Sequence, residues 1–579
     1  MLRRRRVAPF ILFAATFLAA GCGAGPQPVP ADLVLTNGKV VTVDSVRPEA
    51  EAVAIAGDTI VAVGSTSDIE PYIGESTRVI DLDGRLAIPG FIEGHGHFLR
   101  IGEAKMILDL TQARSWDEIV AMVADAAREA EPGEWILGRG WHQEKWDEVP
   151  TPNVDGVPLH DELSAVSPEN PVYLTHASGH ASFANARALS LAGIGPDTPD
   201  PEGGTIVRDP RTGRATGLLR ERAQGLVSAA MDRGRSSETE AARIRRAIEL
   251  ASQEVISKGI TTFHDAGSSF ALIDVYRRMA EAGELPVRLY VMVRNETNET
   301  MAEKLPEYRM IGVADHHLTV RAIKRQVDGA LGSHGAWLLE PYIDLPSSTG
   351  LVLEPLDEIR ETAELAIKYG FQLNTHAIGD RANREMLDLY ESVFKEHPEA
   401  TDLRWRIEHA QHLDPADVPR FHELGIIASM QGIHATSDGP WVAKRLGEER
   451  TQATSYLWHS LIESGAVVTN GTDAPVEDVS PIASFYAAVS RRLADGSVFM
   501  PEQRMTREEA LRSYTINNAY AAFQEDIKGS ITPGKLADIV VLSRDIMTIP
   551  EDQIPDTRVL YTIIGGQVLY TAEAVTASR

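Results

Sequence analysis

The feature that most constrains the fold is a repeated alternation of short apolar runs with amphipathic helices along the middle of the chain. There are eight apolar runs, at residues 87–98, 261–267, 287–293, 320–329, 371–380, 404–411, 426–432 and 467–475. Alternation of strands with helices predicts a parallel sheet. Eight such units predict that the sheet closes into a (β/α)8 barrel, the TIM barrel.

The helices in this pattern carry recognisable start and stop signals. Ser115 and Glu118 form one predicted capping box, and Thr506 and Glu509 form another. The helix in "LDEIRETAELAIKYG" is predicted to end at Gly370. These signals support the division of the chain into separate strand–helix units.

The first two apolar runs are too far apart for a single strand-to-helix connection. We therefore expect an insertion after the first barrel strand, at about residues 100–258. The barrel with this insertion is predicted to span residues 87–526.

Both ends of the ordered chain are rich in short strands. Residues 33–86 contain a hairpin pattern around Gly57-Asp58, and the C-terminal region repeats it around Gly565-Gly566. We expect residues 33–86 and 527–579 to form one composite β-sandwich domain.

The N-terminus has the pattern of an export signal. "MLRRRRVAPFILFAATFLAAGC" combines four arginines, an apolar run and small residues. We expect residues 1–21 to be a lipoprotein signal peptide, Cys22 to be the lipidated residue and residues 22–32 to be a Pro/Gly tether. The protein would then be exported and anchored to the bacterial cell envelope by lipid. The alternative is an ordinary cleaved signal with an incidental cysteine.

The charge balance excludes one class of partner. The chain has 56 Lys and Arg against 83 Asp and Glu, a formal net charge of −27. Nucleic acid binding needs clustered basic residues, so we expect no nucleic acid partner. Cys22 is the only cysteine, so no disulfide can form within one chain.

Polar residues stand at the C-terminal ends of several predicted barrel strands, where barrel enzymes have their catalytic residues. His95 and His97 are two residues apart and so point to the same side of an extended strand. Four further residues end other strands: Lys324, His376, His409 and Asp473. Each signal is weak alone, but together they indicate one site at one rim.

The residue types fit a metal-dependent hydrolase. Imidazole and carboxylate groups suit zinc and similar divalent ions, and a bound metal can lower the pKa of its water to about 7. A carboxylate beside it can take the water's proton and pass it to a leaving group. The amine of Lys324, if neutral, could react with carbon dioxide to give a carbamate that binds metal.

The chain resembles the metal-dependent amidohydrolase superfamily, through motifs spread over residues 33–570. These motifs are "PGFIEGHGHF", "IKRQVDGALGS", "NTHAIGD", "RIEHAQ", "GTDAPVEDVSP" and "KGSITPGKLADIVVL". It is most similar to amidohydrolase family 3, the branch that includes N-substituted formamide deformylases. "GRGWHQEKWDE" and "LTHASGHASFANARAL" in the insertion also match this branch.

The resemblance implies a role for each candidate ligand. His95 and His97 would bind a first metal, and Lys324, as N6-carboxylysine, would bridge to a second. His376 and His409 would bind the second metal, and Asp473 would be both ligand and general base. Zinc is the expected ion, with iron, manganese and cobalt open, and one or two ions per subunit.

Other residues are weaker candidates. Glu93 stands where the family usually has Asp, a change that we expect to be harmless. His334 stands where an Arg-Thr pair is common, in a loop that borders the site, so we expect it to contact the substrate and the substrate to differ. Candidate substrate contacts, each with a structural role as the alternative, are His176, His180, Trp141, Trp146, His434 and Asp438. We expect hydrogen bonds behind the ligands from His264, Asp265 and Asp328.

The leading hypothesis is a hydrolase that acts on carbon–nitrogen bonds other than peptide bonds, through a metal-activated hydroxide and Asp473. One rival is an ester, lactone or phosphoester hydrolase on the same site. The other is a non-catalytic anchored binding protein. The expected partner is a small-molecule substrate; the membrane is contacted only through the lipid anchor, and a homodimer is left open.

Overall fold

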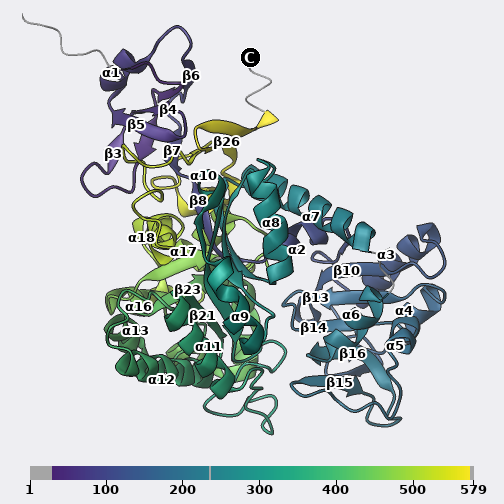
Figure 1. Cartoon of the computed structure of the whole chain (residues 1–579). Helices are drawn as coiled ribbons and strands as arrows, with labels where there is room; N and C mark the ends of the chain where they lie inside the picture. The colour runs from purple at the N-terminus through teal and green to yellow at the C-terminus, as the bar shows by residue number, and fades with distance from the viewer. Residues whose placement is uncertain (1–28, 234–236, 574–579) are drawn as a thin grey trace, which may run out of the picture.

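The protein is described by a computed structural model that covers residues 29–233 and 237–573. The predicted signal peptide at residues 1–21 and Cys22 lie outside these ranges. The central barrel lies between a smaller β region at the upper left and the blue insertion at the lower right (Figure 1). Among the described residues, no helix has the length and apolar character needed to cross a bilayer.

Eight parallel strands form the barrel, and each falls within or overlaps one of the predicted apolar runs. In chain order they are β8 (Phe91–Gly96), β17 (Ile260–Ser268), β18 (Arg288–Val293), β20 (Leu318–Gln326), β21 (Gln372–Ala377), β22 (Arg406–His409), β23 (Ile427–Gln431) and β24 (Val468–Gly471). Neighbours along the chain are neighbours in the sheet. A short strand, β19 (Met310–Gly312), pairs beside β20. The predicted parallel barrel is confirmed as a nearly closed sheet.

The first and last strands meet at a seam that is bridged mainly by groups beyond the strands themselves. The amide of Asp473 donates to the carbonyl of His95 over 2.8 Å. The side chain of Asn518, on α19 (Ile516–Ala521), donates to the carbonyls of Ile92 and Asn470 over 2.6 and 2.9 Å. A Cβ at Gly94 would lie 2.5 Å from the Asn470 carbonyl oxygen, so only glycine allows this approach.

Amphipathic helices cover the outside of the barrel. In α11 (Leu356–Tyr369), the buried residues Ile359, Ala363 and Ala366 recur at helical spacing. The other covering helices are α2 (Phe98–Ala104), α7 (Ser237–Ser257), α8 (Phe270–Glu281), α9 (Asn298–Tyr308), α12 (Asp380–Glu396), α13 (Val418–Leu424), α14 (Gly432–Leu446), α15 (Glu448–Thr454), α16 (Trp458–Glu463), α17 (Pro481–Ser490) and α18 (Arg507–Ser513). The short segment α10 (Val313–His316) is a turn that contains left-handed residues.

The two predicted capping boxes have different outcomes. At the start of α18, Thr506 and Glu509 exchange both hydrogen bonds, as predicted. At the start of α3 (Trp116–Glu129), Ser115 accepts from the amide of Glu118. The Glu118 carboxylate, however, accepts from the amide of Arg114, one residue earlier than the predicted box requires.

The insertion has a mixed sheet and its own core. Its sheet order is β15 (Gly204–Arg208), β16 (Ala215–Glu221), β14 (Ala181–Ala184), β13 (Val172–His176), β10 (Ile136–Trp141) and β9 (Leu108–Asp109). A small hairpin, β11 (Asn153–Val154) and β12 (Val157–Pro158), and the helices α3, α4 (Asp161–Val166), α5 (Ala186–Leu191) and α6 (Gln224–Asp232) complete it. Arg139 joins it to the barrel mouth, donating to the Pro475 carbonyl over 3.0 Å.

Strands from both chain ends form two small sheets. One has the order β5 (Thr59–Gly64), β4 (Ala52–Ala56), β1 (Leu33–Thr36) and β6 (Arg78–Asp81), with α1 (Thr66–Ile69) beside it. The other has the order β27 (Gln567–Thr571), β26 (Val559–Ile564), β25 (Ile539–Leu542), β7 (Leu86–Pro89), β2 (Lys39–Val41) and β3 (Glu49–Ala50). One hydrophobic cluster contains residues of both sheets, among them Leu35, Val53, Ile539 and Ile563.

The turns predicted in these sheets are present. Gly57-Asp58 connects the antiparallel strands β4 and β5, and Gly565-Gly566 connects β26 and β27. The strand β7 pairs with β25 and leads directly into β8, so the small sheets fix the start of the first barrel strand.

Candidate metal centre

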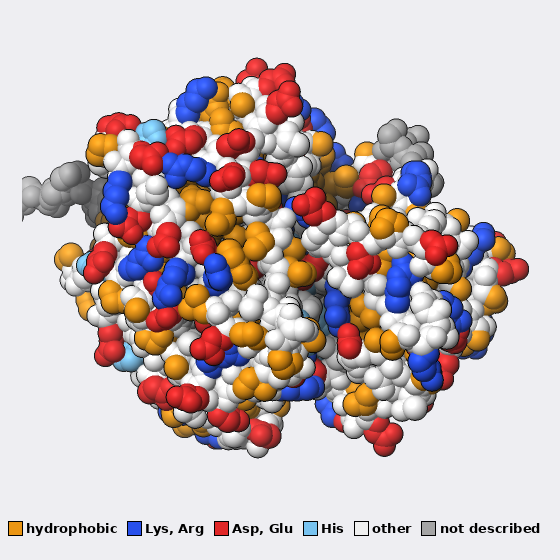
Figure 2. Space-filling view, turned by 90° about the horizontal axis from the view of Figure 1, so that it is seen from below, with side chains coloured by type: hydrophobic (Ala, Val, Ile, Leu, Met, Phe, Trp, Pro, Cys, Tyr) orange, Lys and Arg blue, Asp and Glu red, His pale blue; other side chains and the backbone are white. Residues whose placement is uncertain are grey.

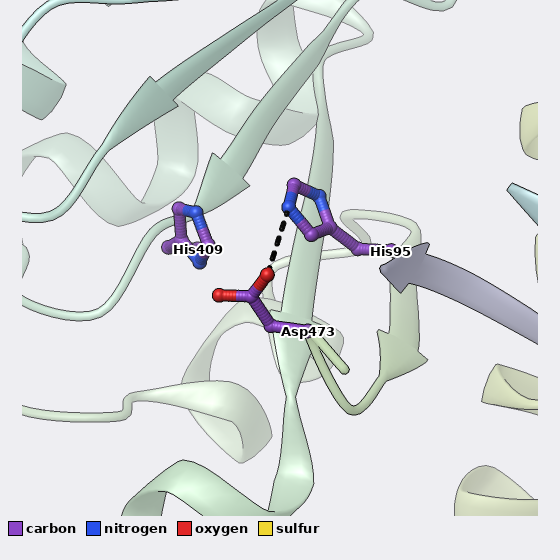
Figure 3. A group of neighbouring side chains, drawn as sticks. All are labelled: His95, His409 and Asp473. Atoms are coloured by element: carbon purple, nitrogen blue, oxygen red, sulfur yellow. Dashed lines mark ion pairs between the residues drawn. The ribbon is translucent and has the colours of Figure 1, made fainter. Parts of the chain in front are cut away.

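Three buried side chains from three strand ends point toward one another at the C-terminal rim of the barrel (Figure 3). His95 comes from β8, His409 from the end of β22, and Asp473 follows β24. One ligand atom from each residue lies within 4.8 Å of the others. Such a spacing would allow one ion to touch all three.

The other three predicted ligands lie around this group. His97 Nε2 is 3.2 Å from Asp473 Oδ1. The His376 ring centroid is 4.4 Å from that of His409. Lys324 is 3% exposed and lines one hollow together with His97, His376, His409 and Asp473. The structure therefore brings all six predicted residues to one place.

Backbone geometry at the strand ends helps to aim these side chains. His409 and Asp473 have φ values of 78° and 56°, which non-glycine residues seldom adopt. Each residue stands where its strand turns into the following loop. Such conformations persist where the surrounding structure holds them, and they occur often at functional sites.

Two side chains hold the imidazoles from behind. Glu408 Oε2 lies 2.5 Å from His95 Nδ1, and Gln431 Oε1 lies 2.8 Å from His409 Nδ1. In the described part of the chain, His95 Nε2 and His376 Nε2 are buried without a hydrogen-bond partner. Buried nitrogens without partners are costly, and His95 has the arrangement of one held and one open nitrogen that metal-binding imidazoles show. His376 Nε2 lies 3.5 Å from Asp328 Oδ1.

Burial sets the charge of the imidazole rings. It lowers the pKa of all four histidines in the cluster, His95, His97, His376 and His409, and that of His97 falls to about 3. The rings are therefore neutral near pH 7 and offer lone pairs. Neutral imidazole is the form that binds divalent metals.

The pKa values of Asp473 and Lys324 are both lowered, for different reasons. Burial alone would raise the pKa of Asp473, but the hydrogen bond from His97 and the nearby rings hold it well below its ordinary value. Burial and the charge of Arg294 lower the pKa of Lys324 to about 8. An ionised carboxylate and neutral imidazoles form a donor set that fits zinc or a similar ion.

A hollow of about 460 Å³ opens onto this cluster and contains several of the predicted substrate contacts. His180, His434 and Asp438 line it, as do His176 and Trp146. The His434 ring centroid is 6.4 Å from that of His409. The Tyr456 hydroxyl donates to Asp438 over 2.7 Å. His180 Nδ1 lies 2.9 Å from Glu221.

Two predicted substrate contacts are elsewhere. Trp141 is 1% exposed and packs in the insertion core against Trp146 and Phe183, where its Nε1 donates to the Leu174 carbonyl. Because the ring of Trp141 is buried in this core, it does not line the hollow, whereas Trp146 does. His334 pairs with Asp344 over 3.1 Å and is not among the residues lining the hollow.

The residues expected behind the ligands have definite partners. Asp328 accepts from the amides of Ile378, Gly379 and Trp337, and so fixes the loop after His376. Asp265 accepts from the amide of Phe98, next to His97.

Two further residues lie inside the barrel. His264 Nδ1 lies 3.3 Å from an Arg406 nitrogen. Burial raises the pKa of Glu93 to about 8, and its carboxylate accepts from the amide of Thr472.

Sequence reasoning missed Glu408 and Gln431 as supports of the histidines. Glu408 is fully buried, although glutamate is seldom buried without a partner. Two features of the sequence could have indicated Glu408. It stands directly before His409, and it belongs to a strand in which charged and apolar residues alternate. Gln431 carries no comparable signal.

Known proteins are similar to this chain over most of their length. The model of the amidohydrolase family matches residues 78–570. Protein LONG AFTER FAR-RED 3 of Arabidopsis thaliana is 36% identical over 94% of this chain and 92% of its own. The N-substituted formamide deformylase of Arthrobacter pascens is 30% identical over 93% of this chain and 98% of its own. The chain therefore belongs to the amidohydrolase family.

A solved structure supports the same conclusion. A metal-dependent hydrolase of uncharacterised activity from Pyrococcus furiosus is 26% identical, with a TM-score of 0.68. The match covers 89% of this chain and all of that one. The resemblance inferred from the motifs is thus confirmed.

Proposed function

We propose that this amidohydrolase cleaves an amide-type C–N bond outside peptides, at a metal centre formed by His95, His97, Lys324, His376, His409 and Asp473. The observation that carries the proposal is that His95 Nε2 and His376 Nε2 are buried without a hydrogen bond among the described residues, while His95 Nε2 lies 3.6 Å from the carboxylate of Asp473. The 30% identical relative named as an N-substituted formamide deformylase supports the choice of bond.

The six residues divide into two ligand groups. His95, His97 and Asp473 would hold one ion, and His376 and His409 would hold a second, with Lys324 between them as a carbamate. When bound, a divalent ion supplies Lewis-acid polarisation of a carbonyl and a lower pKa for water. The buried position of these residues excludes bulk water from the charges that develop in the reaction.

Asp473 is the residue that moves the proton. Its carboxylate, held ionised, can accept a proton from the water molecule that attacks the carbonyl carbon. The C–N bond then breaks, and the same proton passes to the departing nitrogen. The products are a carboxylic acid and an amine, and His97, 3.2 Å away, keeps the carboxylate oriented.

The proposal is tested with purified zinc-loaded protein and a panel of amides and matched esters. We expect amide hydrolysis and a fall in kcat of about 100-fold or more in Asp473→Asn, since an amide cannot accept the proton. Asp495→Asn, on an exposed turn, is the matched control and should keep full activity. Equal turnover by D473N and the parent protein, or cleavage of esters with no amide cleaved, would overturn the proposal.

A further inference from the structure

Two hollows meet at the candidate metal centre. The hollow of about 460 Å³ and a second one of about 330 Å³ share six lining residues: Ser178, His180, His376, His409, Asp473 and Val476. The space-filling view shows the surface hollowed between the barrel and the insertion, with both basic and acidic side chains at its edges (Figure 2). A substrate whose reacting bond lies at the centre would extend into both.

The second hollow is basic, in a chain of net charge −27. Four arginines line it, against the three carboxylates of Glu221, Glu354 and Asp473. The arginines come from separate parts of the chain: Arg100, Arg139, Arg222 and Arg294. We call this cavity the arginine hollow.

The four arginines are not neutralised within the described part of the chain. None of them has a carboxylate within ion-pairing distance there. Arg139 donates to the carbonyls of Pro475 and Ala177, Arg222 to that of Leu353, and Arg294 to the amide oxygen of Gln326.

The carboxylates of the hollow have other partners. Glu221 lies 2.9 Å from His180, and Glu354 lies 3.6 Å from Arg325. Asp473 belongs to the metal centre. Glu354 is near enough to Arg294 and Arg222 to feel their charge, but no carboxylate of the described residues forms an ion pair with any of the four arginines. The guanidinium groups can therefore still donate to a ligand.

The arginines also lie close enough to repel one another. Burial and then the charge of Arg100 lower the pKa of Arg139 to about 10, and the same two causes lower that of Arg294. Converging cations are unfavourable unless an anion offsets them. Guanidinium groups match the planar, two-oxygen shape of a carboxylate better than other cations do.

The first hollow has a different lining. Trp146 and Trp441 line it, with Leu331 and Pro440, and the His142 ring lies 5.9 Å from that of Trp441. Aromatic walls favour an aromatic or branched apolar group. The first hollow also has charged lining residues, among them Arg114, Glu144, Lys145 and Asp438, so the centre stands between a chamber with an aromatic wall and a cationic chamber.

We propose that the arginine hollow is a carboxylate subsite, and that the substrate is an amide with a carboxylate on one side of the reacting bond and an aromatic or apolar group on the other. The second half of this statement rests on the proposed function. The carboxylate has two sources, the substrate itself or the acid that hydrolysis releases. The experiment separates them.

The binding arm uses chelator-treated protein, so that neither metal nor activity contributes. Calorimetric titration with N-benzoylglycine and with its neutral methylamide compares parent protein, Arg100→Gln, Arg294→Gln and the control Arg128→Gln on the surface. In the parent protein and in R128Q, we expect the acid to bind at least about 10-fold more tightly than the methylamide. In R100Q and R294Q, we expect the two ligands to bind equally. Equal binding of acid and methylamide to parent protein would overturn the subsite.

The catalytic arm uses zinc-loaded protein and two pairs of amides, one with the carboxylate on the amine half and one with it on the acyl half. We expect kcat/KM to be about 10-fold higher for at least one acid than for its neutral analogue, and R294Q to abolish the preference. If the acid and its neutral analogue react equally, the substrate does not need a carboxylate and that part of the proposal is overturned. The arginine hollow would then bind only the carboxylic acid that hydrolysis releases. If no amide reacts, the proposed function fails, while the binding arm still decides the subsite.

Discussion

At the scale of single residues, the centre depends on side chains that never face the substrate. His95 can offer Nε2 only because Glu408 fixes Nδ1 from behind, in a site where both side chains are fully buried. Burial alone would raise the pKa of Glu408, but its interaction and hydrogen bond with His95 and the charges of Arg406 and Lys324 outweigh burial and hold the pKa at about 2. Glu408 is thus ionised whenever the protein is near neutral pH.

Glu408→Gln tests this support. A neutral amide gives a weaker hydrogen bond to the imidazole, so we expect the affinity for zinc to fall about 10- to 100-fold. A competition titration against a zinc chelator measures the change. Glu399→Gln, an exposed site, is the control. Unchanged zinc affinity in a folded E408Q protein would contradict the role assigned to Glu408.

The six ligand candidates could be predicted from sequence because barrel strands deliver their last residues to one rim. The arginine hollow could not. Arg100, Arg139, Arg222 and Arg294 come from four separate segments, and no spacing relates them. Trp141 and Trp146 show the same limit, since only the packing of the insertion decides which of the two tryptophans reaches the hollow.

At the scale of elements, glycines decide where helices end. Helix α13 ends at Gly425, which has a φ of 66° and caps the helix through its amide. A Cβ at Gly425 would meet no atom within 4 Å, so only the backbone conformation requires glycine there. Gly225 in α6 also has open space around it, but its conformation is helical.

These two glycines form a matched pair of tests. Gly425→Ala should destabilise the protein by about 1 kcal/mol, because alanine disfavours a positive φ. Gly225→Ala should stabilise it by about 0.5–1 kcal/mol, because alanine loses less freedom in a helix. Scanning calorimetry of both variants gives the two shifts in Tm. Shifts of the same sign would show that the backbone argument is incomplete.

Elements of the barrel were more predictable than those of the insertion. Barrel strands are buried on both faces, so they form apolar runs that stand out between helices. Strands of the insertion are short and mixed in direction, and its sheet includes Gly138, Gly140 and Gly217, which interrupt any pattern. Its sheet order follows from tertiary packing, which local sequence does not record.

At the scale of the whole molecule, one buried ion pair joins the barrel to the C-terminal strands. Arg288, at the start of β18, donates to both oxygens of Asp538 over 2.9 and 3.2 Å. Asp538 precedes β25 and also accepts from the amide of Gly565. Burial alone would raise the pKa of Asp538, but Arg288 and Lys528 outweigh burial and hold it below its ordinary value.

A lowered pKa in the folded state gives this pair a defined pH dependence. The stabilisation is present above the unfolded pKa of about 3.9 and is lost as the pH falls through the lower folded pKa. Asp538→Asn leaves Arg288 buried without a counter-charge, so we expect a loss of about 3–5 kcal/mol at pH 7.

The measurement is a series of thermal melts from pH 8 to pH 3. The difference in Tm between parent protein and D538N should be constant above about pH 5 and shrink below about pH 4. Asp556→Asn, an exposed carboxylate of the same region, is the control. A difference that grows as the pH falls would refute this account.

The pairing of β7 with β25 also determines when the protein can fold during synthesis. Pro89 and Ile539 are opposite one another in the sheet although about 450 residues separate them. A ribosome adding about 5–20 residues per second needs on the order of 20–90 s to make that stretch. Until then one edge of β7 has no partner, and an open strand edge can pair with another chain. A chain that stops before residue 537 keeps this edge exposed, so incomplete products should aggregate while the full-length protein does not.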